Sequence, residues 1–148
     1  MLYSNQLSQL PSQIGNLANL TELSAHNNKI NALPSEIGKL ANLELLNVSD
    51  NKISSLPSEI GHLKKLEQLF IGRNDLKKVP SEIGELKKLQ ILNLSGHTDL
   101  IFPKSIKKLS GSLINLVLSK CCNLTTENDS DLTLDRLKHL FGSRLILQ

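Results

Sequence analysis

Apolar residues recur along this chain at a fixed step of 23 positions. The clearest column stands directly before the five prolines and holds Leu10, Leu33, Leu56, Val79 and Phe102. A second column holds Ile14, Ile37, Ile60, Ile83 and Ile106, and a third holds Leu17, Leu40, Leu63, Leu86 and Leu109. Self-similarity at a fixed step predicts a repeat protein, in which small units stack and bury one continuous apolar core.

Each period contains a short stretch in which apolar and polar residues alternate. Leu46 and Val48 show this pattern, and Leu69 and Ile71 repeat it one period later. Alternation with a period of two predicts a strand of roughly three to five residues with one buried face. Because every period contains such a stretch, we expect neighbouring strands to lie about 4.8 Å apart.

Two further features complete the period. An asparagine follows each strand at a fixed offset, at Asn5, Asn28, Asn51 and Asn74. Its amide both donates and accepts, so we expect stacked copies to satisfy backbone groups of the turn. The segment from Pro34 predicts a short helical or 3-10 turn, with Glu36 near its positive end and Gly38 as the residue that breaks it.

The repeat resembles a known family. The stretch LTELSAHNNKINALPSEIGKLAN and its successors are similar to the typical 23-residue leucine-rich repeat with an LPxxIGxL return. That variant occurs in Ras-pathway scaffold proteins, Scribble-type polarity proteins and their plant and bacterial relatives. The resemblance covers residues 1–124 and implies an α/β solenoid, with parallel strands on a concave face and short helical turns on the convex face. For function, it implies a scaffold that serves many different partners.

Composition agrees with a small stacked unit. Hydrophobic residues make up 39% of the 148 residues, yet aromatic residues make up only 3% and Trp is absent, so the core must consist of Leu and Ile. The sequence contains neither an apolar run long enough to span a bilayer nor a recognisable signal peptide. Its two cysteines, Cys121 and Cys122, are adjacent and cannot join distant segments. These features predict a cytoplasmic protein.

The pattern is interrupted at the first repeat. Leu2 and Asn5 fall in register with Ala25 and Asn28, so the first strand has no capping segment before it. A solenoid needs polar caps at its ends, and an open strand edge favours pairing with another strand. We therefore expect either a piece of a longer protein or a homodimer through the uncapped N-terminal end.

The later repeats also depart from the pattern. His97 and then Cys121 replace the asparagine, the next leucine moves one residue later to Leu100 and Leu124, and the segment from Leu109 gains one residue. We expect a change of curvature or twist there.

Residues 125–148 no longer follow the repeat and predict a C-terminal cap made of a helix and a strand. Thr133 suits the N-cap, Leu137 and Phe141 share one helix face with Leu134 and Leu140, and Gly142 ends the helix. A final strand is predicted from Arg144 to Leu147.

The residues between the buried leucines of each strand are expected to face the concave surface. One column holds Glu22, Leu45, Gln68, Ile91 and Asn115, and the next holds Ser24, Asn47, Phe70, Asn93 and Val117. Residues at the strand exits include Tyr3, His26, Asp50 and Arg73. The predicted partner-binding set is Tyr3, Glu22, His26, Leu45, Asn47, Asp50, Gln68, Phe70, Arg73, Ile91, Asn93 and Val117.

An apolar path crosses this predicted surface at Leu45, Phe70, Ile91 and Val117. Contiguous exposed apolar groups usually mark a contact site, and aromatic residues and arginine are favoured as anchors. Phe70 and Arg73 on one strand are therefore the hypothetical centre of a partner site. The alternative is structural, because Ile and Val suit strands and Phe70 could lie flat on its neighbours.

Basic residues gather in the second half of the chain. Residues 64–120 contain 11 Lys or Arg against 5 Asp or Glu, a local charge of +6 within a total of +3. Lys64 and Lys65 repeat at Lys87 and Lys88, one period apart. Such a basic patch suits nucleic acid or an acidic lipid surface. No aromatic residues interleave with the lysines as single-strand binding requires, so a solvated flank is favoured over either partner.

Catalytic and metal-binding readings find little support. Ser24, His26 and Asp50 are the residue types of a hydrolase triad, but an open strand exit offers no oxyanion donors and no wall against water. His97 and Cys121 would stack in one column, yet zinc prefers four ligands. The glycines recur as turn residues and form no phosphate loop. We therefore expect no enzyme activity, no metal and no cofactor.

The sequence thus favours a non-catalytic module that binds a protein or peptide on its concave face. Stacked strands present a rigid, pre-formed surface that loses little entropy on binding. The alternatives are a structural piece of a larger multidomain protein, or a basic surface for an anionic polymer or membrane. Nucleic acid and membrane are the less favoured partners.

Overall fold

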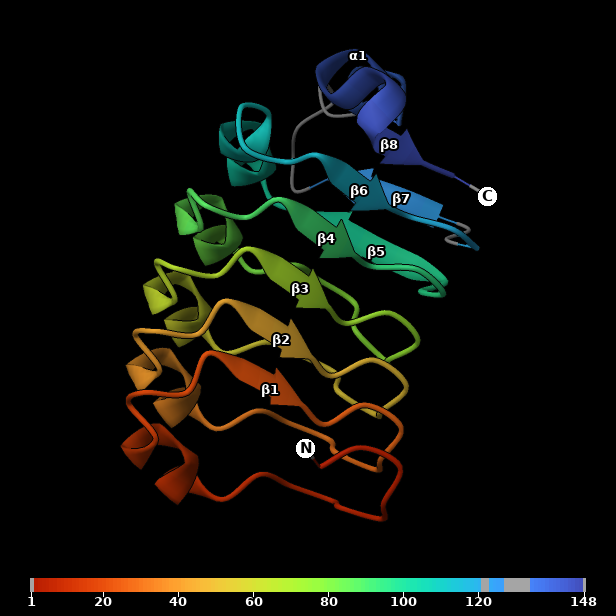
Figure 1. Ribbon diagram of the computed structural model, residues 1–148. Helices are drawn as coiled ribbons and strands as arrows, with labels where there is room; N and C mark the ends of the chain where they lie inside the picture. Colours follow the sequence, from red (N-terminus) through yellow and green to blue (C-terminus); the bar gives the residue numbers. More distant parts are fainter. Residues whose placement is uncertain (1, 121–122, 127–133, 148) are drawn as a thin grey trace.

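The computed structural model describes residues 2–120, 123–126 and 134–147. Short parallel strands lie beside one another along the solenoid in the order β1-β2-β3-β4-β6-β8 (Figure 1). Their bounds are β1 Glu22–Ser24, β2 Leu45–Asn47, β3 Gln68–Phe70, β4 Ile91–Asn93, β6 Asn115–Val117 and β8 Leu145–Ile146. This six-stranded parallel sheet confirms the predicted α/β leucine-rich-repeat solenoid.

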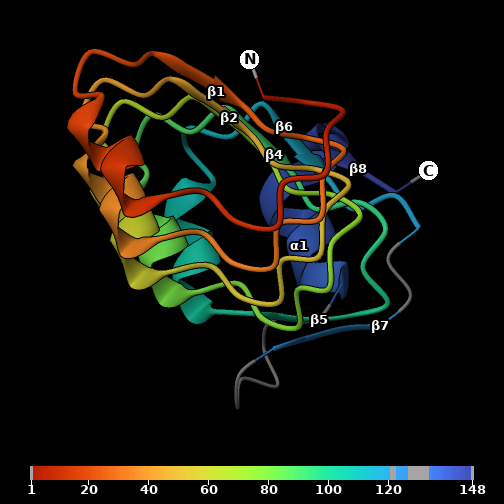
Figure 2. The same ribbon diagram turned by 90° about the horizontal axis from the view of Figure 1, so that it is seen from below.

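A stack of 3-10 helices lies across the core from the strands (Figure 2). Their bounds are η1 Ser12–Asn16, η2 Ser35–Lys39, η3 Ser58–His62, η4 Ser81–Glu85 and η5 Lys104–Leu109. Each follows directly on a proline in extended conformation, as in η2 after Pro34, whose φ is −68° and ψ is 149°. Proline suits this place because its missing N–H would have no partner at a helix start. The prediction of a proline-led helical or 3-10 turn is confirmed.

The repeated glycine has a different role from the predicted one. Gly38 lies inside η2 and does not break it. A Cβ atom at Gly38 would lie 2.7 Å from the carbonyl oxygen of Glu59, and one at Gly61 would lie 2.9 Å from Cβ of Glu82. These distances are shorter than carbon atoms tolerate, so the glycine permits neighbouring 3-10 helices to stack closely. The expectation of a helix breaker is wrong, because the constraint comes from the next repeat.

The leucine and isoleucine columns form one continuous core. Leu46, Leu69 and Leu92, from three successive strands, are each 0% exposed, and so are Ile37, Ile60 and Ile83 of the 3-10 helices. Neither layer buries its apolar residues alone. The core therefore depends on stacking, as in other solenoids.

The asparagine column forms the predicted ladder between repeats. Nδ2 of Asn51 donates to the carbonyl oxygens of Val48 in its own repeat, at 3.1 Å, and of Ala25 in the preceding repeat, at 3.0 Å. Its Oδ1 accepts the backbone N–H of Ile30 at 2.9 Å. Asn74 makes the equivalent bonds one repeat later. One amide thus satisfies backbone groups that the turn leaves without partners.

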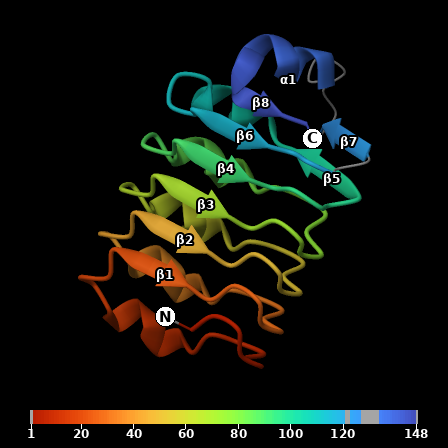
Figure 3. The same ribbon diagram turned by 45° about the vertical axis from the view of Figure 1, so that its right-hand side comes forward.

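A second sheet begins where the leucine column shifts. β5 Asp99–Phe102 pairs in parallel with β7 Asn123–Thr126, on a side of the solenoid away from the main sheet (Figure 3). In β5, Leu100 and Phe102 are buried whereas Asp99 is exposed, so the shifted leucine produces strand-like alternation. The additional residue predicted after Leu109 lies in the turn that follows η5, where Ser110, Gly111 and Ser112 stand in place of Lys87 and Lys88. The predicted change of curvature or twist stays a prediction.

The segment for which the sequence predicts a cap contains a helix and a strand. α1 Leu134–Phe141 buries Leu137 and Phe141, each 1% exposed, and is followed by η6 Gly142–Arg144. β8 pairs with β6 and extends the main sheet. Thr133, the predicted N-cap, lies outside the described residues. The domain boundary at residue 124 stays a prediction.

Arg144 joins this terminal segment to the last repeat. Its guanidinium donates to the carbonyl oxygens of Ser110 at 2.6 Å and Leu113 at 3.0 Å. It also donates to those of Leu140 at 3.0 Å and Phe141 at 3.1 Å, at the C-terminal end of α1. One side chain therefore satisfies carbonyl groups of both segments. Within the described ranges, no helix is long and apolar enough to cross a membrane.

Candidate binding surface

The solvent-facing residues of the main sheet form the two columns that the fixed step predicts. Glu22 pairs with Leu45, Leu45 with Gln68, Gln68 with Ile91 and Ile91 with Asn115. In the second column, Asn47 pairs with Phe70, Phe70 with Asn93 and Asn93 with Val117. We call this surface the concave face. Its register is confirmed; the role of its residues in binding stays a prediction.

The apolar path across the concave face is less exposed than expected. Leu45, Phe70, Ile91 and Val117 are all half-buried. Leu45 and Ile91 are separated by Gln68 in one column, and Phe70 and Val117 by Asn93 in the other. Within each column the apolar side chains therefore alternate with amides, whereas the predicted path runs diagonally from one strand to the next, and its continuity stays a prediction.

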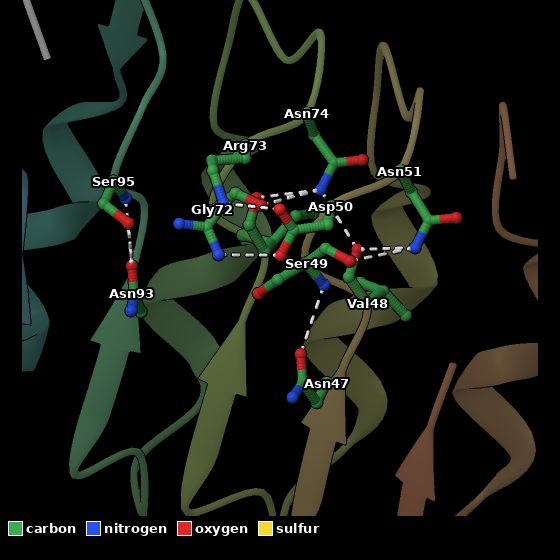
Figure 4. A network of polar contacts seen from close by, with 11 residues as sticks. Asn47, Val48, Ser49, Asp50, Asn51, Gly72, Arg73, Asn74, Asn93 and Ser95 are labelled. Atoms are coloured by element: carbon green, nitrogen blue, oxygen red, sulfur yellow. Dashed lines mark hydrogen bonds and ion pairs between the residues drawn. The ribbon is translucent and has the colours of Figure 1, made fainter. Parts of the chain in front are cut away.

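Two asparagines flank Phe70 in one shared conformation. Oδ1 of Asn47 accepts the backbone N–H of Ser49 at 3.2 Å, and Oδ1 of Asn93 accepts that of Ser95 at 3.0 Å. These bonds assign the oxygen and nitrogen of each amide, because the backbone N–H can only donate. Figure 4 shows both nitrogens pointing away from these turns. Neither has a hydrogen-bond partner among the described residues.

The strand exits hold a row of residues in left-handed backbone conformation. Ser4, Asn27, Asp50, Arg73 and Lys120 all have φ between 51° and 59°, and Gly96 completes the row at 78°. Most side chains avoid this region, at a cost of about 1 kcal/mol or more per residue. The tight turn repeats in every period, so the geometry of the stack imposes it on whatever residue stands there.

Asp50 and Arg73 form an ion pair within this row. The guanidinium donates from Nε to Oδ1 and, at 2.8 Å, from Nη2 to Oδ2 (Figure 4). The hydrogen bond from Arg73 lowers the pKa of the Asp50 carboxyl, against the opposing effect of its partial burial. Both side chains are substantially solvent-exposed, at 36% for Asp50 and 69% for Arg73. The pair orients Arg73 and is expected to add little stability.

An aromatic contact lies at the N-terminal end of the concave face. The rings of Tyr3 and His26 stack with centroids 4.9 Å apart and planes 13° from parallel. Nδ1 of His26 is buried and has no hydrogen-bond partner in the described part of the chain. The stack places Tyr3, an exposed aromatic residue, beside the predicted binding columns.

The basic patch is partly neutralised. Lys64 lies 3.9 Å from Oε2 of Glu85, and Lys108 donates to Oε1 of the same carboxylate at 2.9 Å. The Lys108 hydrogen bond lowers the pKa of Glu85. Lys65 donates to Oδ1 of Asn42 at 2.7 Å. An acidic group therefore stands between the lysines, which argues against a continuous surface for an anionic polymer.

The residues of the hypothetical triad do not assemble. Both carboxylate oxygens of Asp50 bind Arg73, and no bond joins Asp50 to the unpartnered Nδ1 of His26. A triad needs the carboxylate to orient that nitrogen. The described residues contain no group of three potential metal ligands. Nδ1 of the buried His97 bonds with the carbonyl oxygen of Leu94 at 2.8 Å; Cys121 and Cys122 lie outside the described residues.

Sequence reasoning missed an apolar hollow at the N-terminal end. It measures about 410 Å³ and is lined by Leu2, Ile14, Leu17, Leu20, Glu22, Leu23 and Ser24. Leu2 is 37% exposed and Leu17 is 49% exposed, unlike their buried counterparts in later repeats. The repeat pattern did not predict which side chains line this opening.

Comparisons with known proteins identify the repeat. A family model described as a leucine-rich repeat region matches residues 36–142, and a leucine-rich-repeat model matches residues 19–40. A comparison with curated protein sequences finds no match.

Several solved structures resemble the fold. A leucine-rich-repeat protein of Leptospira interrogans is 31% identical with a TM-score of 0.73, over 96% of this chain and 40% of that one. The ectodomain of the Arabidopsis thaliana receptor kinase GASSHO1/SCHENGEN3, in complex with CASPARIAN STRIP INTEGRITY FACTOR 2, is 31% identical with a TM-score of 0.76, over 94% and 16%. The Arabidopsis HAESA ectodomain, in complex with a peptide hormone, is 30% identical with a TM-score of 0.74, over 94% and 23%. The chain thus spans less than half the length of each.

Proposed function

Because the chain belongs to the leucine-rich-repeat family, we propose that its concave face binds a partner protein or peptide without catalysing a reaction. Phe70 carries this proposal. It is a half-buried aromatic side chain at the middle of the sheet, between two amides whose donors have no partner among the described residues. Aromatic residues of this kind, with arginine nearby, are the usual anchors of protein interfaces.

Two further features support the proposal. The strand exits orient Arg73 through Asp50, so the guanidinium loses less freedom when it meets a partner. The sheet is also pre-formed, because its register depends on buried leucines below it. Two of the similar receptor ectodomains were solved with a peptide hormone or an integrity factor bound. We extend protein or peptide binding to this chain as part of the proposal.

The experiment is a pull-down that measures how much partner protein is recovered by each of three variants of the full chain, relative to the wild type. Phe70→Ala and Arg73→Glu remove the two proposed anchors, and each is expected to reduce recovery roughly tenfold or more, as the loss of an interface anchor does. Lys39→Glu is the matched control for the charge reversal, because Lys39 is exposed at the end of η2 in the opposite layer. Unchanged recovery with both anchor variants would end the proposal.

A second candidate function rests on the apolar hollow at the N-terminal end. Leu2 and Leu17 expose an edge of the core there, and such a surface favours a second copy of this chain. Analytical ultracentrifugation over a range of concentrations tests this homodimer. Wild-type chain is expected to self-associate and Leu17→Glu to stay monomeric. A concentration-independent monomer in the wild type would refute it.

A further inference from the structure

The concave face presents two amide donors around Phe70, and the oxygen of each of these amides already accepts a bond from its own turn. Oδ1 of Asn93 accepts both the backbone N–H and, at 2.7 Å, the hydroxyl of Ser95. Oδ1 of Asn47 accepts the backbone N–H of Ser49. The two Nδ2 groups are left to donate. A ligand that covers Phe70 must therefore supply acceptors on both sides of the ring, or these amides lose their hydrogen bonds to water without replacement.

The spacing of these donors selects the backbone conformation of an extended ligand. Asn47, Phe70 and Asn93 pair directly across β2, β3 and β4, so two strand spacings of about 4.8 Å separate the amides by about 9.6 Å. A polyproline II helix rises about 3.1 Å per residue with three residues per turn, so its carbonyls at i and i+3 face one side about 9.3 Å apart. In a β-strand the corresponding spacing is about 6.7 Å for i and i+2. Only the first spacing matches.

The charge of this region selects an acidic ligand. The solvent-facing positions of β3, β4 and β6, all described, carry no carboxylate: they are Gln68, Phe70, Ile91, Asn93, Asn115 and Val117. The carboxylate of Asp50 is occupied by Arg73. Arg73 and the exposed Lys120 stand in the same row of strand exits, on either side of Gly96. Other basic residues of this half of the chain, such as Lys104, Lys107 and Lys108 of η5, lie in the opposite layer, so the cations at the strand exits here are Arg73 and Lys120. An acidic segment would thus be complementary to this part of the concave face.

We infer that the concave face binds an acidic, proline-containing peptide in polyproline II conformation, with carbonyl groups at i and i+3 accepting from Nδ2 of Asn47 and Asn93. A side chain between these two carbonyls packs on Phe70, and a carboxylate of the peptide faces Arg73. A preformed polyproline II segment loses little entropy on binding, and aromatic side chains are its usual platform. The inference rests on the proposed function and specifies the class of its ligand.

The test selects short peptides from a displayed random library on the full 148-residue chain and then titrates a labelled copy of the best binder. Asn47→Asp and Asn93→Asp keep the oxygen that accepts the serine N–H and replace only the donating nitrogen. Each substitution sets an anion against a peptide carbonyl, so affinity is expected to fall about tenfold, and roughly a hundredfold in the double variant. Asn31→Asp makes the same change at an exposed site outside the strands and is expected to leave affinity unchanged.

The outcomes separate this inference from the proposed function. Selected peptides that are rich in proline and acidic residues, and that lose affinity in both aspartate variants, support it. Peptides that need Phe70 but bind both aspartate variants as tightly as the wild type overturn it while the proposed function stands. A preference for β-branched, non-proline peptides overturns it as well. Binding that does not depend on Phe70 or Arg73 overturns the proposed function and, with it, this inference.

A spectroscopic measurement on the wild-type chain does not depend on how the variants fold. The side-chain amide signals of Asn47 and Asn93 are followed by nuclear magnetic resonance while the selected peptide is added. Both are expected to shift at the same peptide concentration, whereas the signal of Asn31 stays in place. Shifts confined to Asn31 or to the ladder residue Asn51 would contradict the inference.

Discussion

The repeats built on Asn28, Asn51 and Asn74 and the repeat built on His97 form the same turn by different chemistry. In the asparagine repeats, one amide bonds to two successive repeats and has an oxygen left to accept a backbone N–H. In the histidine repeat, the imidazole bonds to the carbonyl oxygen of Leu94 alone, and its buried Nε2 has no partner among the described residues.

The two regions differ also on the side away from the main sheet. After His97, the chain enters β5 and pairs with β7, whereas the corresponding stretch after Asn51 forms no strand. A backbone ladder thus begins where the side-chain ladder stops. The bonds of the second sheet lie in β5, beyond the turn, so they add a backbone link between repeats and do not replace the bonds that the amide makes to the turn itself.

The largest effect is expected from a substitution that breaks the column of amides in the asparagine repeats. Asn51→Ala removes the bonds to Ala25, Val48 and Ile30 and leaves buried backbone groups without partners. We expect the free energy of unfolding to fall by about 3 kcal/mol. Urea denaturation measures it. Asn5→Ala, whose exposed amide bonds only within its own turn, is expected to cost less than about 1 kcal/mol; equal losses would contradict the ladder.

The next prediction concerns the terminal segment. Arg144→Met keeps most of the side-chain volume but removes the bonds to Ser110, Leu113, Leu140 and Phe141. A loss of about 2.5 kcal/mol is expected, because charged hydrogen bonds to half-buried carbonyls disappear. Hydrogen exchange at the N–H of Leu118, which donates to Ile146, should become faster. Lys138→Met, which removes only a surface pair with Asp135, should change neither measurement appreciably.

Two glycines extend the comparison to packing. Gly61→Ala places a Cβ atom 2.9 Å from that of Glu82 in the next 3-10 helix, so we expect a loss of about 2 kcal/mol. Gly111→Ala, in the turn after η5, meets nothing within 4 Å and is expected to be neutral or slightly stabilising. Thermal unfolding of both variants checks this. A similar loss at Gly111 would show that intrinsic backbone preference, and not stacking, decides the cost.

The smallest expected effect is the pH dependence introduced by His97. Burial lowers its pKa below the ordinary value of 6.5, with the Leu94 carbonyl and Asp75 opposing burial and Lys77 adding to it. At a pH below about 6.5, His97 of the unfolded chain binds a proton that His97 of the folded chain does not yet bind. The free energy of unfolding therefore falls as the pH drops below about 6.5. Urea denaturation at pH values from about 7.5 down to about 5 measures how the free energy of unfolding changes with pH. This range extends roughly one unit or more on either side of the ordinary histidine pKa. His97→Asn should flatten it, and an unchanged slope would assign it to other groups.

The sequence predicts those contacts of the fold that recur in every repeat, and it does not predict contacts that occur only once. The pairing of Phe70 with Asn47 and Asn93 follows from the step of 23 residues, since equivalent positions must stack. The bonds of Arg144 do not follow from any pattern, because that arginine occurs once and its acceptors lie up to 34 positions away. The half-burial of Phe70 was also unpredictable, since it depends on the neighbouring side chains.

The sequence by itself determined the stacked architecture, the register of its columns and the amide ladder, because each of these is repeated identically and each repeat constrains the next. Only the tertiary structure decided that the repeated glycine admits a neighbouring helix, that a second sheet follows His97, and that the donors of Asn47 and Asn93 are left to face solvent. Those features depend on distances between chemically different groups in adjacent repeats. A one-dimensional period places such groups side by side, but it does not say which of their hydrogen bonds are already made.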